Sequence, residues 1–439
     1  MIAGDTIVAV ATPFGYSGIA VIRLSGPGSI NLIIKTTSRS FYENRVATLA
    51  CVRSPGGETI DRALVTVFSS PKSYTGENLV EISTHGNPSI INGVISLLVE
   101  MGARLAEPGE FTYRAFMNGK MDLVQAEAVS SLIHSKSEEN SRVQQKIISG
   151  DLSLILNRVR SELILQLSTL EYQMDISEED ITGSSFSRLI EKIDHIKEEV
   201  NALLGTYEMG RLLNGGLSVA ISGAPNVGKS SLFNLIANAD RAIVSDQPGT
   251  TRDVIDVEIV LSGVPVRFFD TAGLRKASSA VEKEGVVKAL DKKRSADIVL
   301  SVYDSPKKKP TTPNEKNKTI YVLNKLDIHK DRSDPSVIHI SCLEKVGLDL
   351  LFLKIQERAG FERVSTDIAY LSTARQFSSL LGCSQFLDET KRLLSSHPDG
   401  LELIAYELRE AVGSLDVLLG KTTAEEIINN IFSTLCVGK

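Results

Sequence analysis

The chain has 439 residues, of which 42% are hydrophobic and 23% charged, and its formal net charge is −6 at pH 7. These values are typical of a soluble globular protein with about three domains. They exclude an overall basic field, so contact with nucleic acid would have to be local or assisted by a partner. The four cysteines show no C-x-x-C spacing, which excludes a four-cysteine zinc site and predicts a reducing compartment. Because signal-peptide features and an apolar run of ~20 residues are both missing, we expect a cytoplasmic protein without membrane contact.

Three sequence patterns follow one another and predict a multidomain α/β plus α protein. Residues 1–118 mix strand-like runs such as TIVAVAT and IAVIRLSG with turn residues and one helix expected at 89–101, as in an α/β or α+β domain. Residues 119–212 show helical periodicity, residues 213–362 alternate strands and helices, and residues 363–439 are helical again. The simplest architecture inserts a nucleotide domain into a helical domain. Whether the two helical parts pack together stays open.

A phosphate-binding loop lies near the middle of the chain. Residues 223–231, GAPNVGKSS, have the spacing G-x-x-x-x-G-K-S, with the strand-like run LSVAIS before them and the helical run SSLFNLIANA after them. Backbone N–H groups at such a helix start form an anion site. Lys229 is expected to reach the β- and γ-phosphates, and the Ser230 hydroxyl to bind Mg²⁺. The predicted contacts here are Asn226, Val227, Gly228, Lys229, Ser230 and Ser231.

The base is predicted from residues 324–327, NKLD, which directly follow the apolar run TIYVL. Asp327 offers two acceptor oxygens to the paired N–H donors of guanine, whereas adenine would leave the carboxylate without donors. Downstream of a P-loop, this motif indicates GTP rather than ATP. Its predicted contacts are Asn324, Lys325 and Asp327.

Two further stretches lie between these motifs. Residues 270–273, DTAG, follow the run VPVRFF, and Asp270 is expected to hold Mg²⁺ through water. Residues 245–253, SDQPGTTRD, place Thr251 as a second hydroxyl on Mg²⁺. Such contacts order a switch loop while γ-phosphate is present. The predicted contacts are Ser245, Asp246, Gln247, Pro248, Gly249, Thr250, Thr251, Asp270, Thr271, Ala272 and Gly273. The whole set predicts a Ras-like P-loop GTPase domain.

The residue after DTAG departs from a simple signalling switch. Ras-like proteins place a water-orienting Gln there, whereas this chain has Leu274, which cannot orient water. The polar side chains nearby are Arg275, Glu282, Lys283 and Glu284. From local chemistry, either some of them assist hydrolysis or all four belong to a solvated segment. The Asn226 side chain could likewise bind a monovalent cation beside the phosphates or only shape the turn.

Beyond these motifs, the chain resembles one family from its first residues to its last. SYTGENLVEISTHGNP at 73–88, EPGEFTYRAFMNGKMDLVQAEAV at 107–129 and the terminal IFSTLCVGK are similar to the MnmE (TrmE) family, within the TrmE–Era–EngA–Septin-like GTPases. The resemblance implies a K⁺-stimulated GTPase that works in a heterotetramer with the flavoprotein MnmG. Together they would attach an aminomethyl or carboxymethylaminomethyl group to carbon 5 of the wobble uridine of certain tRNAs.

The resemblance also implies a folate one-carbon donor, 5-formyl- or 5,10-methylene-tetrahydrofolate, on an N-terminal folate-binding-like domain that also forms a homodimer. The residues at the matching motif positions, which the resemblance implies as folate ligands, are Arg23, Glu81, Lys120 and the terminal Lys439. Basic groups suit the carboxylates of folate, and Glu81 can pair with the donor edge of a pterin. By themselves, Arg23 and Glu81 fit a cross-strand salt bridge equally. Cys436 becomes a candidate reactive thiol, the alternative being a small buried hydrophobe.

The family also implies an answer for Leu274. Its G domains pair face to face when GTP is bound, and K⁺ takes the place of an arginine finger. The implied K⁺ ligands are Asn226, Ser245, Gln247 and Thr250. Glu282 would orient the attacking water, and with Lys229 and Cys436 it completes the candidate catalytic residues. The guanine-supporting S-A-K element is replaced by SCLEK at 341–345, so we expect weaker base contact and rapid exchange.

Two other functions remain open. A ribosome-assembly or RNA-binding GTPase of the Era or EngA type would carry a second G domain or a basic RNA-binding module, and the mostly helical C-terminal part ending in CVGK disfavours it. A regulatory switch that only recruits a partner would need no one-carbon ligand. Folate titration on the N-terminal domain separates that switch from the enzyme.

Overall fold

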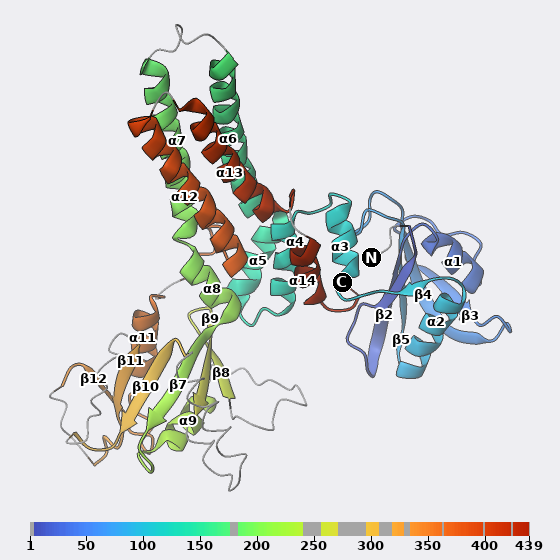
Figure 1. Ribbon diagram of the computed structural model, residues 1–439. Helices are drawn as coiled ribbons and strands as arrows, with labels where there is room; N and C mark the ends of the chain where they lie inside the picture. Colours follow the sequence, from blue (N-terminus) through green and yellow to red (C-terminus); the bar gives the residue numbers. More distant parts are fainter. Residues whose placement is uncertain are drawn as a thin grey trace, which may run out of the picture. The chain divides into compact units, whose positions relative to one another are not determined.

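Figure 1 shows the computed structural model of the chain. The structure describes residues 4–175, 183–239, 256–270, 296–306, 318–328, 334–361, 364–397, 400–422 and 425–438. The chain divides into two compact units. The first consists of Met1–Ile133, Ile147–Lys197 and Ser379–Lys439, and the second of His134–Lys146 and Glu198–Ser378. None of the helices within the described ranges is long and apolar enough to cross a membrane.

The N-terminal part of the first unit is built on a six-stranded sheet with the order β3-β4-β5-β2-β1-β6. Its strands are β1 (Ile7–Val10), β2 (Ser17–Ser25), β3 (Thr48–Arg53), β4 (Thr59–Phe68), β5 (Leu79–Gly86) and β6 (Arg104–Leu105). Neighbouring strands are antiparallel, apart from the parallel pair β1 and β6. The mixture of α and β structure predicted for this region is confirmed, whereas its binding of folate stays a prediction.

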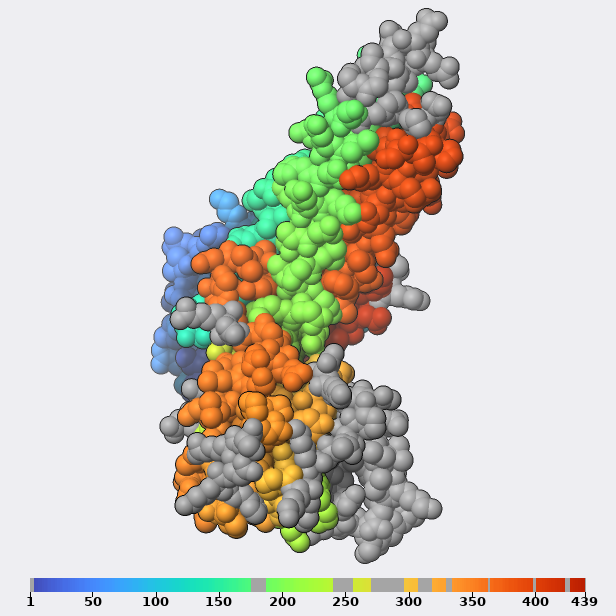
Figure 2. Space-filling view, turned by 90° about the vertical axis from the view of Figure 1, so that its left-hand side faces the viewer, coloured from blue at the N-terminus to red at the C-terminus, as the bar shows by residue number. Residues whose placement is uncertain are grey.

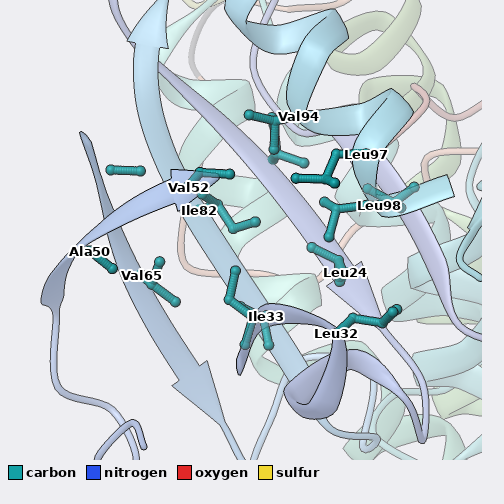
Figure 3. Close-up of a cluster of buried hydrophobic side chains, with 14 of the residues drawn as sticks. Leu24, Leu32, Ile33, Ala50, Val52, Val65, Ile82, Val94, Leu97 and Leu98 are labelled. Atoms are coloured by element: carbon teal, nitrogen blue, oxygen red, sulfur yellow. The ribbon is translucent and has the colours of Figure 1, made fainter. Parts of the chain in front are cut away.

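Two helices cover one face of this sheet, α1 (Ser29–Thr36) and α2 (Pro88–Glu100). The helix predicted at 89–101 is therefore confirmed as α2, which begins where the Asn87 side chain accepts a hydrogen bond from Ser89 N at 2.9 Å. Figure 3 shows Leu24 and Ile82 of the sheet packed with Leu97 and Leu98 of α2 and Ile33 of α1. Since side chains alternate along a strand, the neighbours of Leu24 and Ile82 face the opposite side of the sheet.

The helical parts before and after the second unit's sheet do pack together. The helices are α3 (Glu110–Met117), α4 (Leu123–Ile133), α5 (Glu138–Ser149), α6 (Asp151–Asp175), α7 (Gly183–Leu204), α12 (Ala374–Ser396), α13 (Leu401–Leu419) and α14 (Glu425–Ser433). Arg160 of α6 forms a 2.5 Å ion pair with Asp416 of α13, and Lys391 of α12 forms a 2.6 Å ion pair with Asp194 of α7. Figures 1 and 2 show α7 alongside α12. The question left open by the sequence is thus answered.

The second unit contains another six-stranded sheet, with the order β12-β11-β10-β7-β9-β8. Its elements are α8 (Tyr207–Gly215), β7 (Leu217–Gly223), α9 (Lys229–Ala237), β8 (Asp256–Leu261), β9 (Val264–Asp270), β10 (Ile298–Tyr303), β11 (Thr319–Leu323), β12 (Val337–His339) and α11 (Leu348–Ala359). Only the pair β8 and β9 is antiparallel among these described strands. The carboxyl ends of β7, β10 and β11 therefore lie at one edge of the sheet, where ligands bind in such folds.

Candidate functional site

The P-loop joins the end of β7 to the start of α9, as the sequence predicts. Asn226 has φ +63° and Gly228 has φ +95°, so the chain passes twice through the left-handed region before the helix begins. Lys229 is 7% exposed, and its Nζ donates a hydrogen bond to Ala224 O at 2.7 Å. Ser230 is exposed at the first turn of α9. This arrangement offers an ammonium group, backbone N–H groups and a hydroxyl to a phosphate chain.

A buried amide joins the P-loop to the predicted base-binding motif. Asn324 follows β11 and is 3% exposed. Its Nδ2 donates to Val227 O at 3.0 Å, and its Oδ1 accepts from Cys342 N at 3.3 Å. A Cβ at Gly228 would lie 2.1 Å from Asn324 Nδ2, so this close approach requires glycine. The two motifs predicted to bind opposite ends of GTP are therefore brought together.

The aspartate predicted to read guanine is oriented by a hydroxyl. Ser341 Oγ donates to Asp327 Oδ1 at 2.7 Å and itself accepts from Glu344 N at 3.1 Å. Lys325 forms a 2.9 Å ion pair with Asp304. Burial raises the pKa of the Cys342 thiol to about 11, so this residue is a neutral group beside the base site.

Several predicted GTP contacts fall outside the described residues. These are Ser245, Asp246, Gln247, Pro248, Gly249, Thr250, Thr251, Thr271, Ala272 and Gly273, and the predicted catalytic residue Glu282 lies outside the described residues as well. Asp270 ends β9 and lies opposite Ile221 in the parallel register with β7. Within the described ranges, no group of three His, Cys, Asp or Glu side chains is arranged to hold a metal ion. The Mg²⁺ and K⁺ ligand sets stay predictions.

A second candidate site lies on the face of the N-terminal sheet opposite α1 and α2. Arg23 of β2 and Glu81 of β5 are direct partners in the strand register, and they form a 2.7 Å ion pair. The guanidinium carbon of Arg23 lies 5.7 Å from the ring centroid of Tyr74 and 5.8 Å from that of Phe111. The cross-strand salt bridge considered from the sequence is confirmed, and two aromatic rings that the sequence did not single out complete its surroundings.

The C-terminal tail reaches this site. Arg23 Nη1 donates to Gly438 O at 3.1 Å, and Gly109 N donates to Cys436 O at 3.3 Å. Gly438 has φ +94°, and a Cβ there would lie 2.1 Å from Val10 O. Cys436 is exposed, so it is not the small buried hydrophobe of the alternative interpretation. Its role as a reactive thiol stays a prediction.

The other two residues predicted to bind folate are placed differently. Lys120 is attached to residues 69–76, since its Nζ donates to Pro71 O at 3.0 Å. Tyr74, beneath Arg23, belongs to the same loop. Lys439 lies outside the described residues. The structure therefore brings Arg23 and Glu81 into contact and links Lys120 to them through one loop.

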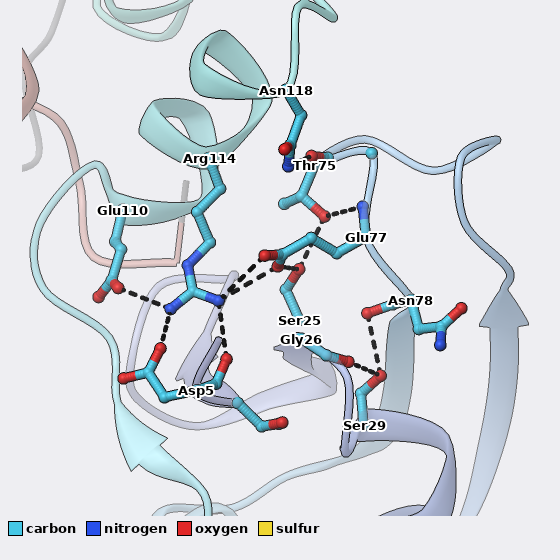
Figure 4. Close-up of polar contacts among 12 residues, drawn as sticks. Asp5, Ser25, Gly26, Ser29, Thr75, Glu77, Asn78, Glu110, Arg114 and Asn118 are labelled. Carbon is cyan, nitrogen blue, oxygen red and sulfur yellow. Dashed lines mark hydrogen bonds and ion pairs between the residues drawn. The ribbon is translucent and has the colours of Figure 1, made fainter. Parts of the chain in front are cut away.

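Figure 4 shows a charged network beside this site to which the sequence gave no role. Arg114 donates to Glu77 Oε2 at 3.2 Å and to Glu110 Oε1 at 3.0 Å, and it also contacts Asp5. Arg104 pairs with Asp5 and Glu110, each at 2.7 Å. Three of these five residues lie in stretches 73–88 and 107–129, which carry the family resemblance. That placement is the one signal by which the sequence could have indicated the network.

Two acidic members of this network, Asp5 and Glu110, stay ionised although they are enclosed. Burial by itself raises the pKa of Asp5 and of Glu110, but hydrogen bonds and charges from Arg104 and Arg114 outweigh it. Both carboxyls therefore have a pKa below the usual value. The Glu110 side chain is fully buried, and besides the two arginines the Glu107 N–H stabilises its charge by donating to Oε2 at 2.9 Å.

Family models match most of the chain. The model described as GTP-binding protein TrmE N-terminus matches residues 6–120. The model described as MnmE helical domain matches residues 123–436. These two matches meet between the N-terminal sheet and α4, and the second runs across the second unit.

Relatives match over nearly the full length. The tRNA modification GTPase MnmE of Aquifex aeolicus (strain VF5) is 38% identical over 99% of this chain and 100% of its own. The tRNA modification GTPase MnmE of Thermotoga maritima is 39% identical over the same shares of both chains. Among solved structures, the G domain of the T. maritima FeoB iron transporter is 28% identical over 33% of this chain and 98% of its own, with a TM-score of 0.24.

Proposed function

The chain belongs to the MnmE family of tRNA modification GTPases, and from this membership we propose a specific reaction for it. The protein is a GTP hydrolase that takes part in tRNA modification. In the proposal it forms a homodimer in the cytoplasm. This homodimer works together with the flavoprotein MnmG in a heterotetramer. The product is an aminomethyl or carboxymethylaminomethyl group on carbon 5 of the wobble uridine, with tetrahydrofolate as the one-carbon donor.

The observation that carries the GTPase assignment is the contact between the P-loop and the NKLD motif. The Asn324 amide bridges Val227 O and Cys342 N, which ties the phosphate site to the base site. Asp327 has one oxygen engaged by Ser341, and its orientation is thereby set. A carboxylate in this position accepts from the two N–H groups on the edge of guanine.

Hydrolysis needs positive charge near the phosphates and an oriented water. Lys229 now donates to Ala224 O and can exchange this carbonyl for phosphate oxygens without leaving the loop. Mg²⁺ would supply charge between the β- and γ-phosphates, held by Ser230 and Thr251. In our proposal Glu282 orients the water, and Asn226 would help to hold K⁺, which would supply further positive charge beside the phosphates.

The arrangement around Arg23 suits one-carbon chemistry on a folate. The two hydrogen bonds that Arg23 donates to Glu81 both go to Oε1. Within the described part of the chain, this leaves Glu81 Oε2 free to accept from the N–H donors of a pterin. Arg23 also holds the tail through Gly438, so the exposed Cys436 is kept near the same face. This arrangement supports the folate assignment.

An Asp327→Asn substitution tests the base assignment. Asparagine places an N–H₂ donor where guanine also has a donor, whereas xanthine has an acceptor there. We expect the kcat/KM for GTP to fall by about 100-fold or more and hydrolysis of xanthosine triphosphate to become measurable. Asp349→Asn, on α11 outside these motifs, is the matched control. Unchanged preference for GTP would contradict the assignment.

The modification itself is tested in cells that lack the protein. Nucleoside analysis of their tRNA should show loss of the C5 group on the wobble uridine, and expression of the wild-type chain should restore it. Purified protein should hydrolyse GTP faster in potassium than in sodium buffer. Intact wobble uridine modification in the deleted cells would rule out the proposed reaction, and equal rates in the two buffers would rule out the role of K⁺.

A further inference from the structure

Two cations converge on one loop of the N-terminal domain. Arg45 Nη2 donates to Lys72 O at 2.7 Å, and Lys120 Nζ donates to Pro71 O at 3.0 Å. Successive carbonyls of residues 69–76 thus each receive a charged donor. Lys72 is itself exposed. We call Arg45, Lys72 and Lys120 the cationic loop edge.

No carboxylate in the described ranges forms an ion pair with this edge. In the part of the chain that the structure describes, none of the three cations forms an ion pair, whereas Arg104 and Arg114 of the same domain each contact acidic side chains. The acidic residue nearest Arg45 in sequence, Glu43, is exposed and is not paired with it among the described residues. Three positive charges therefore gather on a chain whose net charge is −6.

The backbone holds Arg45 in place at an energetic cost. Its φ is +63°, a left-handed conformation that is unfavourable for a residue with a side chain. Arg45 N donates to Val67 O at 2.7 Å, and Asn44 Oδ1 accepts from Ser69 N at 2.8 Å. Strained positions of this kind persist where the surroundings enforce them and are frequent at binding sites.

The cationic loop edge adjoins the candidate one-carbon site. Tyr74, two residues after Lys72, lies beneath the guanidinium of Arg23, and Tyr74 Oη is 2.8 Å from Thr112 Oγ1. The loop that receives the cations is therefore the loop that lines the site. A polymer bound along this edge would run beside the loop whose Tyr74 contacts Arg23.

We propose that the cationic loop edge binds the phosphate backbone of the anticodon loop of tRNA, so that the target base reaches the site at Arg23. The inference rests on the proposed function. Cations that form no ion pair within the described residues suit phosphates, which provide most of the affinity for RNA. Phe41, four residues before Arg45, is 73% exposed and offers a face for base stacking, as single-stranded RNA sites do. The aromatic face favours RNA over the polyglutamyl tail of a folate.

The test measures binding of a fluorescent anticodon stem-loop RNA to the full-length protein over a range of salt concentrations. An Arg45→Gln and Lys72→Gln double variant should bind at least about tenfold more weakly at low salt. The slope of the logarithm of the binding constant against the logarithm of the salt concentration should be shallower by about 1.4. Each lost phosphate contact removes roughly 0.7 from this slope for a single strand, and two contacts are lost. Lys35→Gln on α1 and Arg53→Gln on β3, two other exposed cations, are the matched controls.

The Arg45→Lys variant distinguishes an effect of charge on RNA binding from an effect of the arginine's shape. It keeps the positive charge and should retain most of the RNA binding. The double variant should keep the wild-type unfolding temperature and rate of GTP hydrolysis. RNA binding equal to the wild type would overturn the proposal. So would unchanged RNA binding with weaker binding of folate polyglutamate, because the edge would then hold the folate tail. Failure of the proposed function is seen separately, as intact wobble uridine modification in cells without the protein.

Discussion

The side-chain amide of Asn324 donates a hydrogen bond to the backbone carbonyl of Val227 at 3.0 Å. This buried contact joins the loop after β11 to the loop after β7, across the intervening strand β10. A change at either residue therefore affects both the base site and the phosphate site. The same contact explains why Gly228 follows Val227, because any side chain there would displace the amide.

Gly228→Ala should abolish tight GTP binding. The added Cβ would lie 2.1 Å from Asn324 Nδ2, at a φ of +95° that disfavours alanine. Strain and displacement together should weaken GTP binding by about 100-fold or more, since about 1.4 kcal/mol corresponds to a factor of ten. Titration with a fluorescent GTP analogue measures this. Gly215→Ala, where the added Cβ has no neighbour within 4 Å, should bind like the wild type. Equal affinities for both variants would contradict the interpretation.

The described part of the candidate GTP site could be predicted from the sequence because the P-loop and residues 324–327 are local motifs that the fold aligns. A strand, a glycine-rich loop and a helix in succession specify the P-loop, and residues 324–327 directly follow a buried strand. In a parallel sheet, loops after neighbouring strands lie at one edge. The contact of Asn324 with Val227 follows from this arrangement, although the hydrogen bond itself could not be read from spacing.

The N-terminal site was less accessible to such reasoning because its contacts link distant residues. Asp5 and Arg114 are 109 positions apart, and Arg23 and Gly438 are 415 positions apart. These contacts depend on how the sheet, α3 and the tail pack, and no periodicity encodes that packing. Family resemblance indicated Arg23 and Glu81 but assigned nothing to Tyr74, whose ring lies under the guanidinium.

Glu282→Ala should slow GTP hydrolysis by about 100-fold while leaving GTP affinity nearly intact, because a water-orienting group acts mainly in the transition state. Leu274 cannot take over this role. Single-turnover hydrolysis and nucleotide titration should be measured in potassium buffer. Glu284→Ala, two residues further along the same segment, serves as the control and should hydrolyse GTP much faster than Glu282→Ala. An unchanged rate in Glu282→Ala would show that another group positions the water.

Gly438→Ala should impair tRNA modification without slowing GTP hydrolysis. The new Cβ would lie 2.1 Å from Val10 O, so the tail must shift and carry Cys436 with it. A displacement of about 1 Å in a reacting group can lower a rate by roughly 100-fold. Modified wobble uridine in complemented cells is the measurement. Gly413→Ala on α13, where the added Cβ meets no neighbour within 4 Å, is the control. Full modification by Gly438→Ala would show that the position of the tail is unimportant.

Arg114→Met should strongly destabilise the N-terminal domain. It would leave Asp5, Glu77 and the fully buried Glu110 with fewer positive partners. Removing one partner of a buried ion pair typically costs about 3–5 kcal/mol. Hydrogen exchange of the α3 amides measures the loss where it occurs. Arg142→Met breaks an exposed pair with Glu138 and should cost less than about 1 kcal/mol. Equal protection in the two variants would exclude the network as a source of stability.

The same network predicts a loss of stability in acid. Burial raises the pKa of Asp5 and Glu110, but the hydrogen bonds and positive charges of Arg104 and Arg114 lower it by more. Both folded-state pKa values therefore lie below the ordinary 3.8 and 4.5. Groups with depressed pKa values contribute full stability above their unfolded-state pKa and lose it as the pH falls towards the folded-state value. Protection of α3 amides should therefore be constant from pH 7 to about 5 and then fall below pH 4.5. In Arg114→Met the acid-dependent fall should be shallower, and parallel curves for the two proteins would contradict this account.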